Sequence, residues 1–435
     1  MARMVINRYG SLGSVGLLWL LAFSLICWPA LSGASETLPL RVRKVIVQAQ
    51  QLMEQQQYDA ALAVLDSQRQ RVQRHHLVDF TLGNIYLLSE RHAEAVEWYE
   101  SVVEQQPEYS GAWLNVAQCY YVLERYIEAA EAFEQSYQLV TPPRSQLRYN
   151  AALAYLQGEK PAAAVSLLKQ LVVDFPDQNS VPWRAALVQS YNGLDLHQLA
   201  LPHLEFLADA TTGDDQRRWR ELLVQHYLVL KMVDKALHAV DGYTQIDGLE
   251  PLWWKLLTSI HLDAGRYSKG LVALKVLAYL QPLTEQEQHL LADLYLTLGV
   301  PQEAVRYYET LQQQRPHDEQ LLTRLAHASL NLHQPEDALF WLQQAQGDSV
   351  DVKLLMLQGQ LLFSLKRYAE AVEVFGRLAQ SEEQPGSSWL MQGYAAWNGE
   401  LWTQARKALE NAQRYPRQKK KAAALLKQLN EIELR

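Results

Sequence analysis

An alanine or a glycine recurs along this chain at almost equal intervals. Successive members of the series lie 33 to 36 residues apart through most of the 435 residues. The eleven members are Ala61, Ala95, Ala129, Ala164, Ala200, Ala236, Gly270, Ala304, Ala338, Ala371 and Ala405. A fixed period of about 20 to 50 residues indicates supersecondary units that stack on their neighbours. The sequence therefore predicts a solenoid, whose extended surface binds partners instead of enclosing a catalytic pocket.

Two further positions share this period when the small residue is numbered position 20 of its unit. Position 24 carries a large apolar residue: Leu65, Tyr99, Phe133, Leu168, Leu204, Val240, Leu274, Tyr308, Leu342, Phe375 and Leu409. Position 8 carries a small or short one: Ala49, Gly83, Ala117, Ala152, Val188, Val224, Thr258, Ala292, Ala326, Gly359 and Gly393. Small residues at positions 8 and 20 allow two helices to approach closely, and the large residue fills the space beside them.

Tyrosine at position 11 and proline at unit ends complete the pattern. The tyrosines are Tyr86, Tyr120, Tyr155, Tyr191, Tyr227 and Tyr295, and the prolines are Pro107, Pro176, Pro282 and Pro316. Proline at these places stops one helix before the next unit begins. With these residues the chain resembles the tetratricopeptide repeat (TPR) family, most closely in its second and eighth units.

The resemblance covers about residues 42–417 as eleven helix–turn–helix units, starting near residues 42, 76, 110, 145, 181, 217, 251, 285, 319, 352 and 386. It implies an all-α fold, a right-handed superhelical solenoid. Residues 418–435 follow as one amphipathic helix, which we expect to cap the last unit because that unit has no neighbour to cover it.

The first 34 residues have the layout of a secretory signal peptide. Arg3 and Arg8 precede an apolar stretch at residues 15–28, and the small residues 32–34 offer a cleavage site. The apolar stretch is shorter than the ~20 residues that span a bilayer. An uncleaved membrane anchor is the alternative, because no charge occurs between Arg8 and Glu36. Either interpretation places the repeats outside the cytoplasm, with residues 35–41 as a short linker.

Charge and motifs argue against several classes of function. The formal net charge of −8 argues against a nucleic-acid binder. No phosphate loop, zinc-protease motif or nucleophile elbow occurs, so we expect no enzyme, no cofactor and no metal site. His75, His76 and Asp79 could be metal ligands, but adjacent histidines point to different helix faces, so a solvated junction between loop and helix is expected. Cys119 is expected to be a packed thiol, since no second cysteine remains after the leader.

The run Arg414, Arg417, Lys419, Lys420 and Lys421 has two interpretations. It is either the solvated end of the array or a surface for an anionic partner or a membrane. Cations in the first turn of a helix oppose the helix dipole, which costs about 0.3–1 kcal/mol per charge.

The inner face of the solenoid is the predicted binding groove. In the TPR family this face comes mainly from the first helix of each unit. In units two to four it includes Phe80, Asn84, Asn115, Gln118, Gln146, Tyr149 and Asn150. Asn84 and Asn115 match two asparagines of the family's carboxylate clamp. Phe80, Gln146 and Asn150 replace its basic residues, so an amide ladder for an extended peptide is expected instead. The alternative is that these asparagines face solvent and bind nothing.

A second group of groove residues, and one further resemblance, concern the far units. Tyr394 and Trp397 occupy groove positions in unit eleven and could stack on a carbohydrate. Residues 252–255 (Leu-Trp-Trp-Lys) and 299–301 (Gly-Val-Pro) are similar to a periplasmic TPR protein that accompanies TonB–ExbB–ExbD systems. This resemblance implies a periplasmic scaffold with membrane-tethered protein partners and a role in outer-membrane uptake. The alternative is an assembly factor of an exopolysaccharide or envelope export machine.

Overall fold

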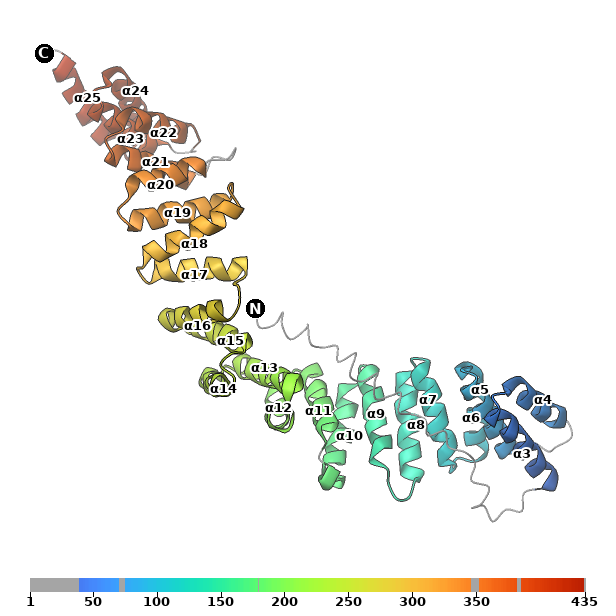
Figure 1. Cartoon of the computed structure of the whole chain (residues 1–435). Coiled ribbons are helices and arrows are strands. Elements are labelled where there is room, and N and C mark those ends of the chain that lie inside the picture. Colours follow the sequence, from blue (N-terminus) through green and yellow to red (C-terminus); the bar gives the residue numbers. More distant parts are fainter. Residues whose placement is uncertain (1–38, 70–74, 179, 346–351, 382–384, 434–435) are drawn as a thin grey trace. The chain divides into compact units, whose positions relative to one another are not determined.

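The computed structural model describes residues 39–69, 75–178, 180–345, 352–381 and 385–433 (Figure 1). These ranges contain α-helices, one short 3₁₀ helix and no strand. The predicted leader at residues 1–34 and most of the linker lie outside them. The helices are α3 Leu40–Glu54, α4 Tyr58–Arg69, α5 His76–Leu88, α6 His92–Gln105, α7 Ser110–Val122, α8 Tyr126–Leu139, α9 Ser145–Gln157, α10 Pro161–Asp174, η1 Pro176–Gln178, α11 Val181–Gly193, α12 His197–Ala210, α13 Gly213–Val229, α14 Val233–Ile246, α15 Pro251–Asp263, α16 Tyr267–Leu280, α17 Glu285–Thr297, α18 Pro301–Gln314, α19 Glu319–Asn331, α20 Pro335–Gln344, α21 Val352–Ser364, α22 Tyr368–Ser381, α23 Gly386–Asn398, α24 Trp402–Gln413 and α25 Lys419–Glu433.

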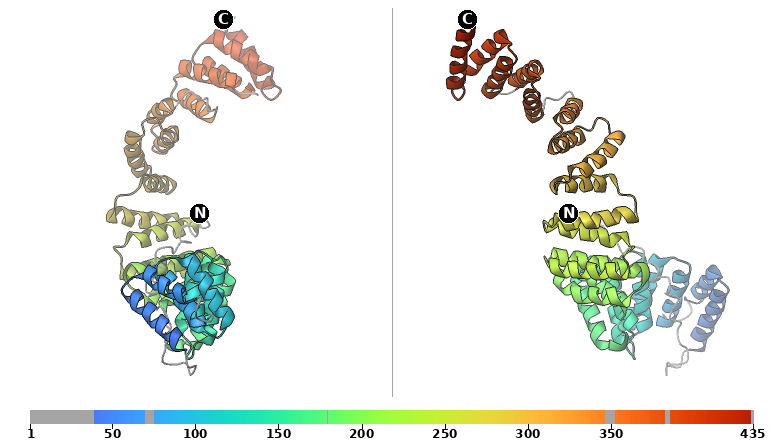
Figure 2. Two further views of the ribbon diagram at one scale, coloured as in Figure 1. Left: turned by 90° about the vertical axis from the view of Figure 1, so that its right-hand side faces the viewer. Right: turned by 60° about the vertical axis from the view of Figure 1, so that its left-hand side comes forward.

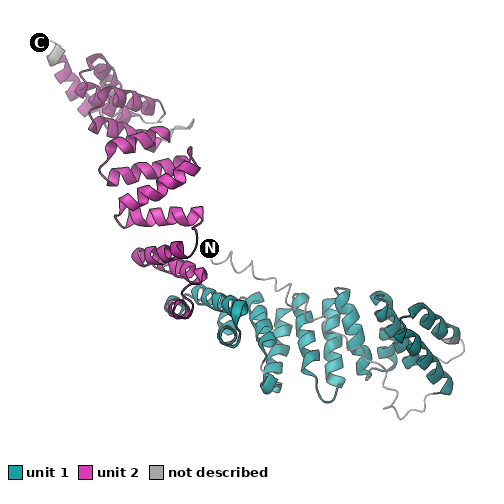
Figure 3. Ribbon diagram, in the orientation of Figure 1, with its two compact units in different colours: residues 1–236 teal, residues 237–435 magenta. Residues whose placement is uncertain are grey.

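The described helices form consecutive helix–turn–helix units, from α3–α4 to α23–α24, with α25 after the last. Figure 2 shows consecutive helices side by side in two further views. The predicted fold class, an all-α helical-repeat solenoid with a final helix, is confirmed. The chain divides into two compact units, residues 1–236 and 237–435, which Figure 3 colours separately. Each is described by itself below.

The periodic small residues lie where the helices of a unit meet. All eleven residues at position 20 are buried, and so are all eleven at position 24. A Cβ atom on Gly83 would lie 2.6 Å from the ring of Tyr99, so the absence of a side chain on α5 makes room for the tyrosine on α6. Burial of one large side chain against two small ones explains why the period appears in the sequence.

Every turn between the two helices of a unit contains one residue with positive φ, always at position 15. These residues have φ of 55° to 75°, and they are Gln56, Glu90, Glu124, Glu159, Asp195, Lys231, Gly265, Gly299, His333, Lys366 and Glu400. The backbone N–H of the following residue, at position 16, donates to the carbonyl of position 11. In unit two the N–H of Arg91 donates to the carbonyl of Tyr86 at 2.8 Å. A left-handed residue and this back-bond together end the first helix.

Candidate functional site

The predicted groove amides lie on three successive first helices. Asn84 is on α5, Asn115 and Gln118 are on α7, and Asn150 is on α9. The three asparagine side chains are at most 4% exposed, and Gln118 is partly buried. Buried amides cost free energy unless they are hydrogen-bonded. Their bonding partners therefore decide what each can do.

Asn84 and Asn115 join units two and three. Tyr99 Oη donates to Asn84 Oδ1 at 2.7 Å, and Asn115 Nδ2 donates to the same oxygen at 2.9 Å. The Asn115 amide also lies 3.3 Å from the Tyr99 hydroxyl. The Oδ1 atom of Asn84 is thus used inside the structure, whereas Oδ1 of Asn115 is buried without a partner.

The same arrangement recurs in units eight and nine with charged groups. Tyr308 Oη donates to Asp293 Oδ1, and Arg324 Nη1 lies 3.1 Å from Asp293 Oδ2. The tyrosine is at position 24, the acceptor at position 9, and the donor at position 6 of the next unit. We call this triple of positions a node. Its recurrence in both compact units shows that it follows from the geometry of the repeat.

The node between units three and four lacks its hydroxyl. Phe133 occupies position 24, Gln118 position 9 and Asn150 position 6 of the next unit. Asn150 Oδ1 accepts from Gln146 Nε2 at 2.8 Å. The amide nitrogens of Gln118 and Asn150 are buried and have no hydrogen-bond partner. Each unpaired donor costs about 1–3 kcal/mol. The role of Phe133 was not predicted; the signal for it in the sequence is the change from Tyr99 to Phe133 at position 24 of successive units.

The other predicted groove residues differ in exposure. Phe80 is fully buried and packs its ring 5.7 Å from that of Tyr99 and 5.0 Å from that of Tyr109, so a ligand does not reach it. Gln146 is exposed, and Tyr149 is partly buried. Burial raises the pKa of Tyr149 to about 12.

Tyr394 and Trp397 on α23 are partly buried and serve the packing of unit eleven. Tyr394 packs against the buried cluster that contains Leu390 and Leu409. The Trp397 ring meets that of Trp402 edge to face at 5.9 Å. Part of the surface of both rings is therefore covered by neighbouring side chains and is not accessible to a sugar.

The histidines, the aspartate and the cysteine considered above as reactive groups or metal ligands are engaged in packing or hydrogen bonds. His75 Nδ1 accepts from the N–H of Leu77 and caps α5, and Asp79 accepts from Ser101 at 2.9 Å. Burial raises the pKa of the Cys119 thiol to about 12, far from a reactive thiolate. Within the described ranges no three His, Cys, Asp or Glu side chains converge as metal ligands.

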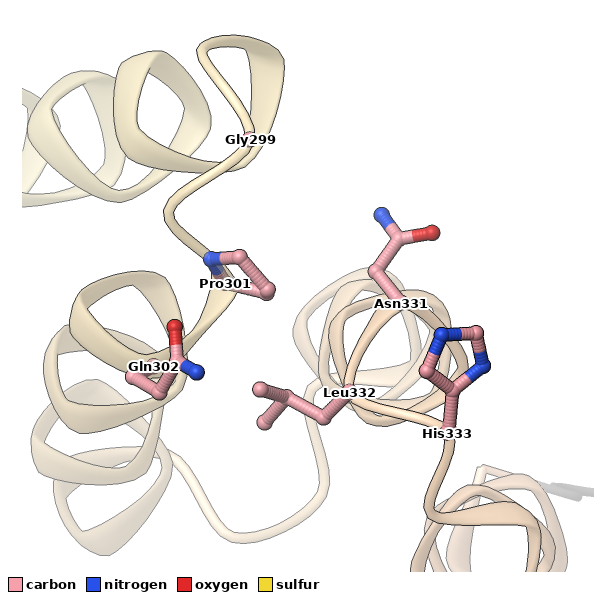
Figure 4. Close-up of a pocket in the computed structure, with 6 residues that line it drawn as sticks. All are labelled: Gly299, Pro301, Gln302, Asn331, Leu332 and His333. Atoms are coloured by element: carbon pink, nitrogen blue, oxygen red, sulfur yellow. The ribbon is translucent and has the colours of Figure 1, made fainter.

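A surface pocket lies between the turns of units eight and nine. Gly299, Pro301, Gln302, Asn331, Leu332 and His333 line it. Figure 4 shows the side chain of Leu332, in the turn of unit nine, facing Gln302 of unit eight. Asn331 and His333 project from the same turn as Leu332. The lining groups can hydrogen-bond but carry no carboxylate or lysine, so the pocket offers no catalytic pair.

The residues behind the second resemblance stabilise the second compact unit. Trp253 is buried, with its ring 5.0 Å from that of Tyr243. Trp254 Nε1 donates to the carbonyl of Gly248 at 2.8 Å, and Lys255 Nζ lies 3.1 Å from Glu287.

None of the helices in the described ranges is both long and apolar enough to span a bilayer.

Comparisons with protein families support the repeat. Tetratricopeptide repeat models match residues 46–110, 99–141 and 146–177. The model for anaphase-promoting complex, cyclosome, subunit 3 matches residues 299–378. No curated protein matches the chain.

Several solved helical-repeat structures are similar to the chain at low identity. A tetratricopeptide repeat protein from Parabacteroides merdae is 12% identical over 66% of this chain and 98% of its own, with a TM-score of 0.32. A MamA mutant is 18% identical over 38% of this chain and 94% of its own, with a TM-score of 0.31. Yeast Tom70 is 12% identical over 90% of this chain and 96% of its own, with a TM-score of 0.28.

Proposed function

We propose that this chain, which carries tetratricopeptide repeats, is a non-catalytic periplasmic scaffold for protein partners. Its groove holds an extended segment of a membrane-tethered component of a TonB–ExbB–ExbD-type complex. The observation that carries the proposal is the set of unpaired amide atoms on α7 and α9: Asn115 Oδ1, Gln118 Nε2 and Asn150 Nδ2.

The unpaired atoms match the chemistry of a peptide backbone. Asn115 Oδ1 is an acceptor for an N–H group, and the amide nitrogens of Gln118 and Asn150 are donors for a carbonyl. These atoms are buried in the free chain, so binding requires all three side chains to turn outward. The turn gives the unpaired amide atoms bonded partners, which offsets the loss of the bond from Gln146 to Asn150 Oδ1.

Location and partner rest on the sequence. The leader-like residues 1–34 support export, and the resemblance at residues 252–255 and 299–301 supports the TonB-type partner. A disordered segment loses conformational freedom when it binds, so we expect modest affinity that depends on several backbone contacts at once.

The test is crosslinking and capture from intact cells, read by mass spectrometry. The bait variant is Gln118→Ala with Asn150→Ala. Asn84 stays unchanged, because its removal would break the bond to Tyr99. The matched control is Gln135→Ala, an exposed glutamine on α8. The loss of two amide contacts should reduce partner recovery at least about tenfold, and the control should not.

Three results would count against the proposal. Equal recovery by variant and wild type would move the binding surface away from α7 and α9. Recovery of glycan-synthesis proteins would favour the export-machine alternative. Cytoplasmic localisation of the full chain would exclude the periplasmic role.

A further inference from the structure

The C-terminal end of the second compact unit carries a concentrated positive charge. Residues 411–430 contain six basic residues and no acidic one. They are Arg414, Arg417, Lys419, Lys420, Lys421 and Lys427, which we call the basic end. All six are exposed. The whole chain has a net charge of −8, so without these six it would have −14.

The cations of the basic end have no partners in the described part of the chain. Several arginines elsewhere are paired at close range, as Arg125 is with Glu128 and Arg367 with Glu370. No carboxylate in the described residues lies within 4.0 Å of the nitrogens of the basic end. Three lysines in the first turn of α25 also oppose its dipole. The arrangement therefore costs stability and contributes no internal ion pair.

The apolar side of α25 is already covered. Ala422 and Leu429 are fully buried, and Leu425 and Leu426 pack against the cluster that contains Leu409. Among the side chains that the structure describes on α25, no apolar stripe remains for insertion into a hydrocarbon layer. Attraction to this end is therefore electrostatic and confined to a partner's surface.

The type of cation favours a lipid surface over a folded acidic protein. Four of the six residues are lysines, which are hydrated point charges without the planar fork that arginine uses for directional pairing. Three consecutive helical lysines point in different directions, so they match no single rigid arrangement of carboxylates. A fluid array of anionic headgroups requires no such match, and clusters of four to eight basic residues are typical of surfaces that bind anionic lipids.

We propose that the basic end binds anionic phospholipid headgroups on a membrane surface. The rest of the chain has a net charge of −14, so the attraction to an anionic surface is concentrated at this end. The proposal needs no protein partner and is independent of the groove.

The test is co-sedimentation of the full chain with lipid vesicles. One set is phosphatidylcholine alone, and the other contains about one-third phosphatidylglycerol. The variant is Lys419→Glu, Lys420→Glu, Lys421→Glu. The control, Lys169→Glu, Lys231→Glu, Lys366→Glu, makes the same charge change at exposed lysines elsewhere. A lysine near an anionic surface strengthens partitioning about fivefold, so loss of three lysines should weaken it at least roughly 100-fold.

Acetylation of lysines locates the contact even if residues 1–34 also bind lipid. Anionic vesicles should protect Lys419–Lys421 from acetylation and leave Lys231 and Lys366 reactive, and about 0.5 M salt should remove the protection. Equal binding by variant and control, or equal protection by neutral vesicles, would overturn the proposal. Protection only by an added acidic protein would overturn it as well.

Discussion

At the scale of single residues, the chemistry of the groove depends on which side chain stands at position 24. Tyr99 completes its node with a hydroxyl, and Phe133 does not. One oxygen atom therefore separates a node whose donor groups are paired from one with two unpaired donors. Natural proteins rarely leave buried donors unpaired, and such exceptions require an explanation.

Phe133→Tyr should fill the incomplete node from inside. Its hydroxyl would lie where the Tyr99 hydroxyl lies one unit earlier, and it would accept from Gln118 or Asn150. We expect the free energy of unfolding to rise by about 0.5–1.5 kcal/mol and partner capture to weaken, because the donors are no longer free. Denaturant melts and the capture experiment above measure these two effects.

Tyr99→Phe is the matched control in the opposite direction. It removes the hydroxyl from a complete node and should lower stability by a similar amount. If Phe133→Tyr also lowered stability, the amides of units three and four would not be arranged as those of units two and three are, and the node account would be wrong.

The asparagines could be predicted from the sequence, but their bonds could not. The period places Asn84, Asn115 and Asn150 on first helices because it fixes backbone positions. Side-chain rotamers depend on packing, so the burial of Phe80 and the bond from Tyr99 to Asn84 become visible only in the structure.

At the scale of helices and turns, position 15 shows a local conflict that the fold tolerates. Nine of the eleven units place a residue other than glycine at positive φ there, and only Gly265 and Gly299 are glycines. A left-handed conformation costs a residue with a Cβ about 1–2 kcal/mol. The back-bond to position 11 and the packing of both helices hold these turns in place.

Gly299→Ala should therefore destabilise the turn between α17 and α18 by about 1 kcal/mol. A Cβ at Gly299 would contact nothing within 4 Å, so the cost of the substitution comes only from the backbone conformation, with its φ of 75°. Gly242→Ala inside α14 also meets open space, but its φ is not positive, so it should stabilise by about 0.5–1 kcal/mol. Hydrogen exchange around each site measures both changes, and equal signs would contradict the interpretation.

Helix bounds depend on local capping as well as on the period. The first helix of unit six, α13, begins at Gly213, ahead of the predicted start near residue 217. Asp214 and Asp215 lie in its first turn, where carboxylates favour the helix dipole. Such local electrostatic interactions extend a helix without disturbing the packing at positions 20 and 24 of the unit.

At the scale of the whole molecule, the fold class was the most predictable property. Small residues at positions 8 and 20 repeat because every unit solves the same packing problem, so eleven weak signals add up. The unpaired amides of the node at Phe133, Gln118 and Asn150 belong to one pair of units and are not repeated along the chain. The features that all units share could therefore be predicted from the sequence, and the features of a single node could not.

Ala304→Leu tests whether stability is local, as a solenoid requires. Ala304 on α18 is fully buried in the cluster that contains Leu291, Tyr308 and Leu321. Three more carbons should overpack this cluster and cost about 1–3 kcal/mol. Units of a solenoid couple only to their neighbours, so the loss should stay within units seven to nine.

Hydrogen exchange read by mass spectrometry separates local from global loosening for this variant. Residues 251–345 should exchange faster, and residues 76–144 in the other compact unit should keep their wild-type rates. Gln313→Leu is the control, because it adds an apolar side chain at an exposed site on the same helix and should change neither region. Equal loosening of both regions by Ala304→Leu would mean that the chain unfolds as one cooperative body, and the nearest-neighbour account of its stability would be wrong.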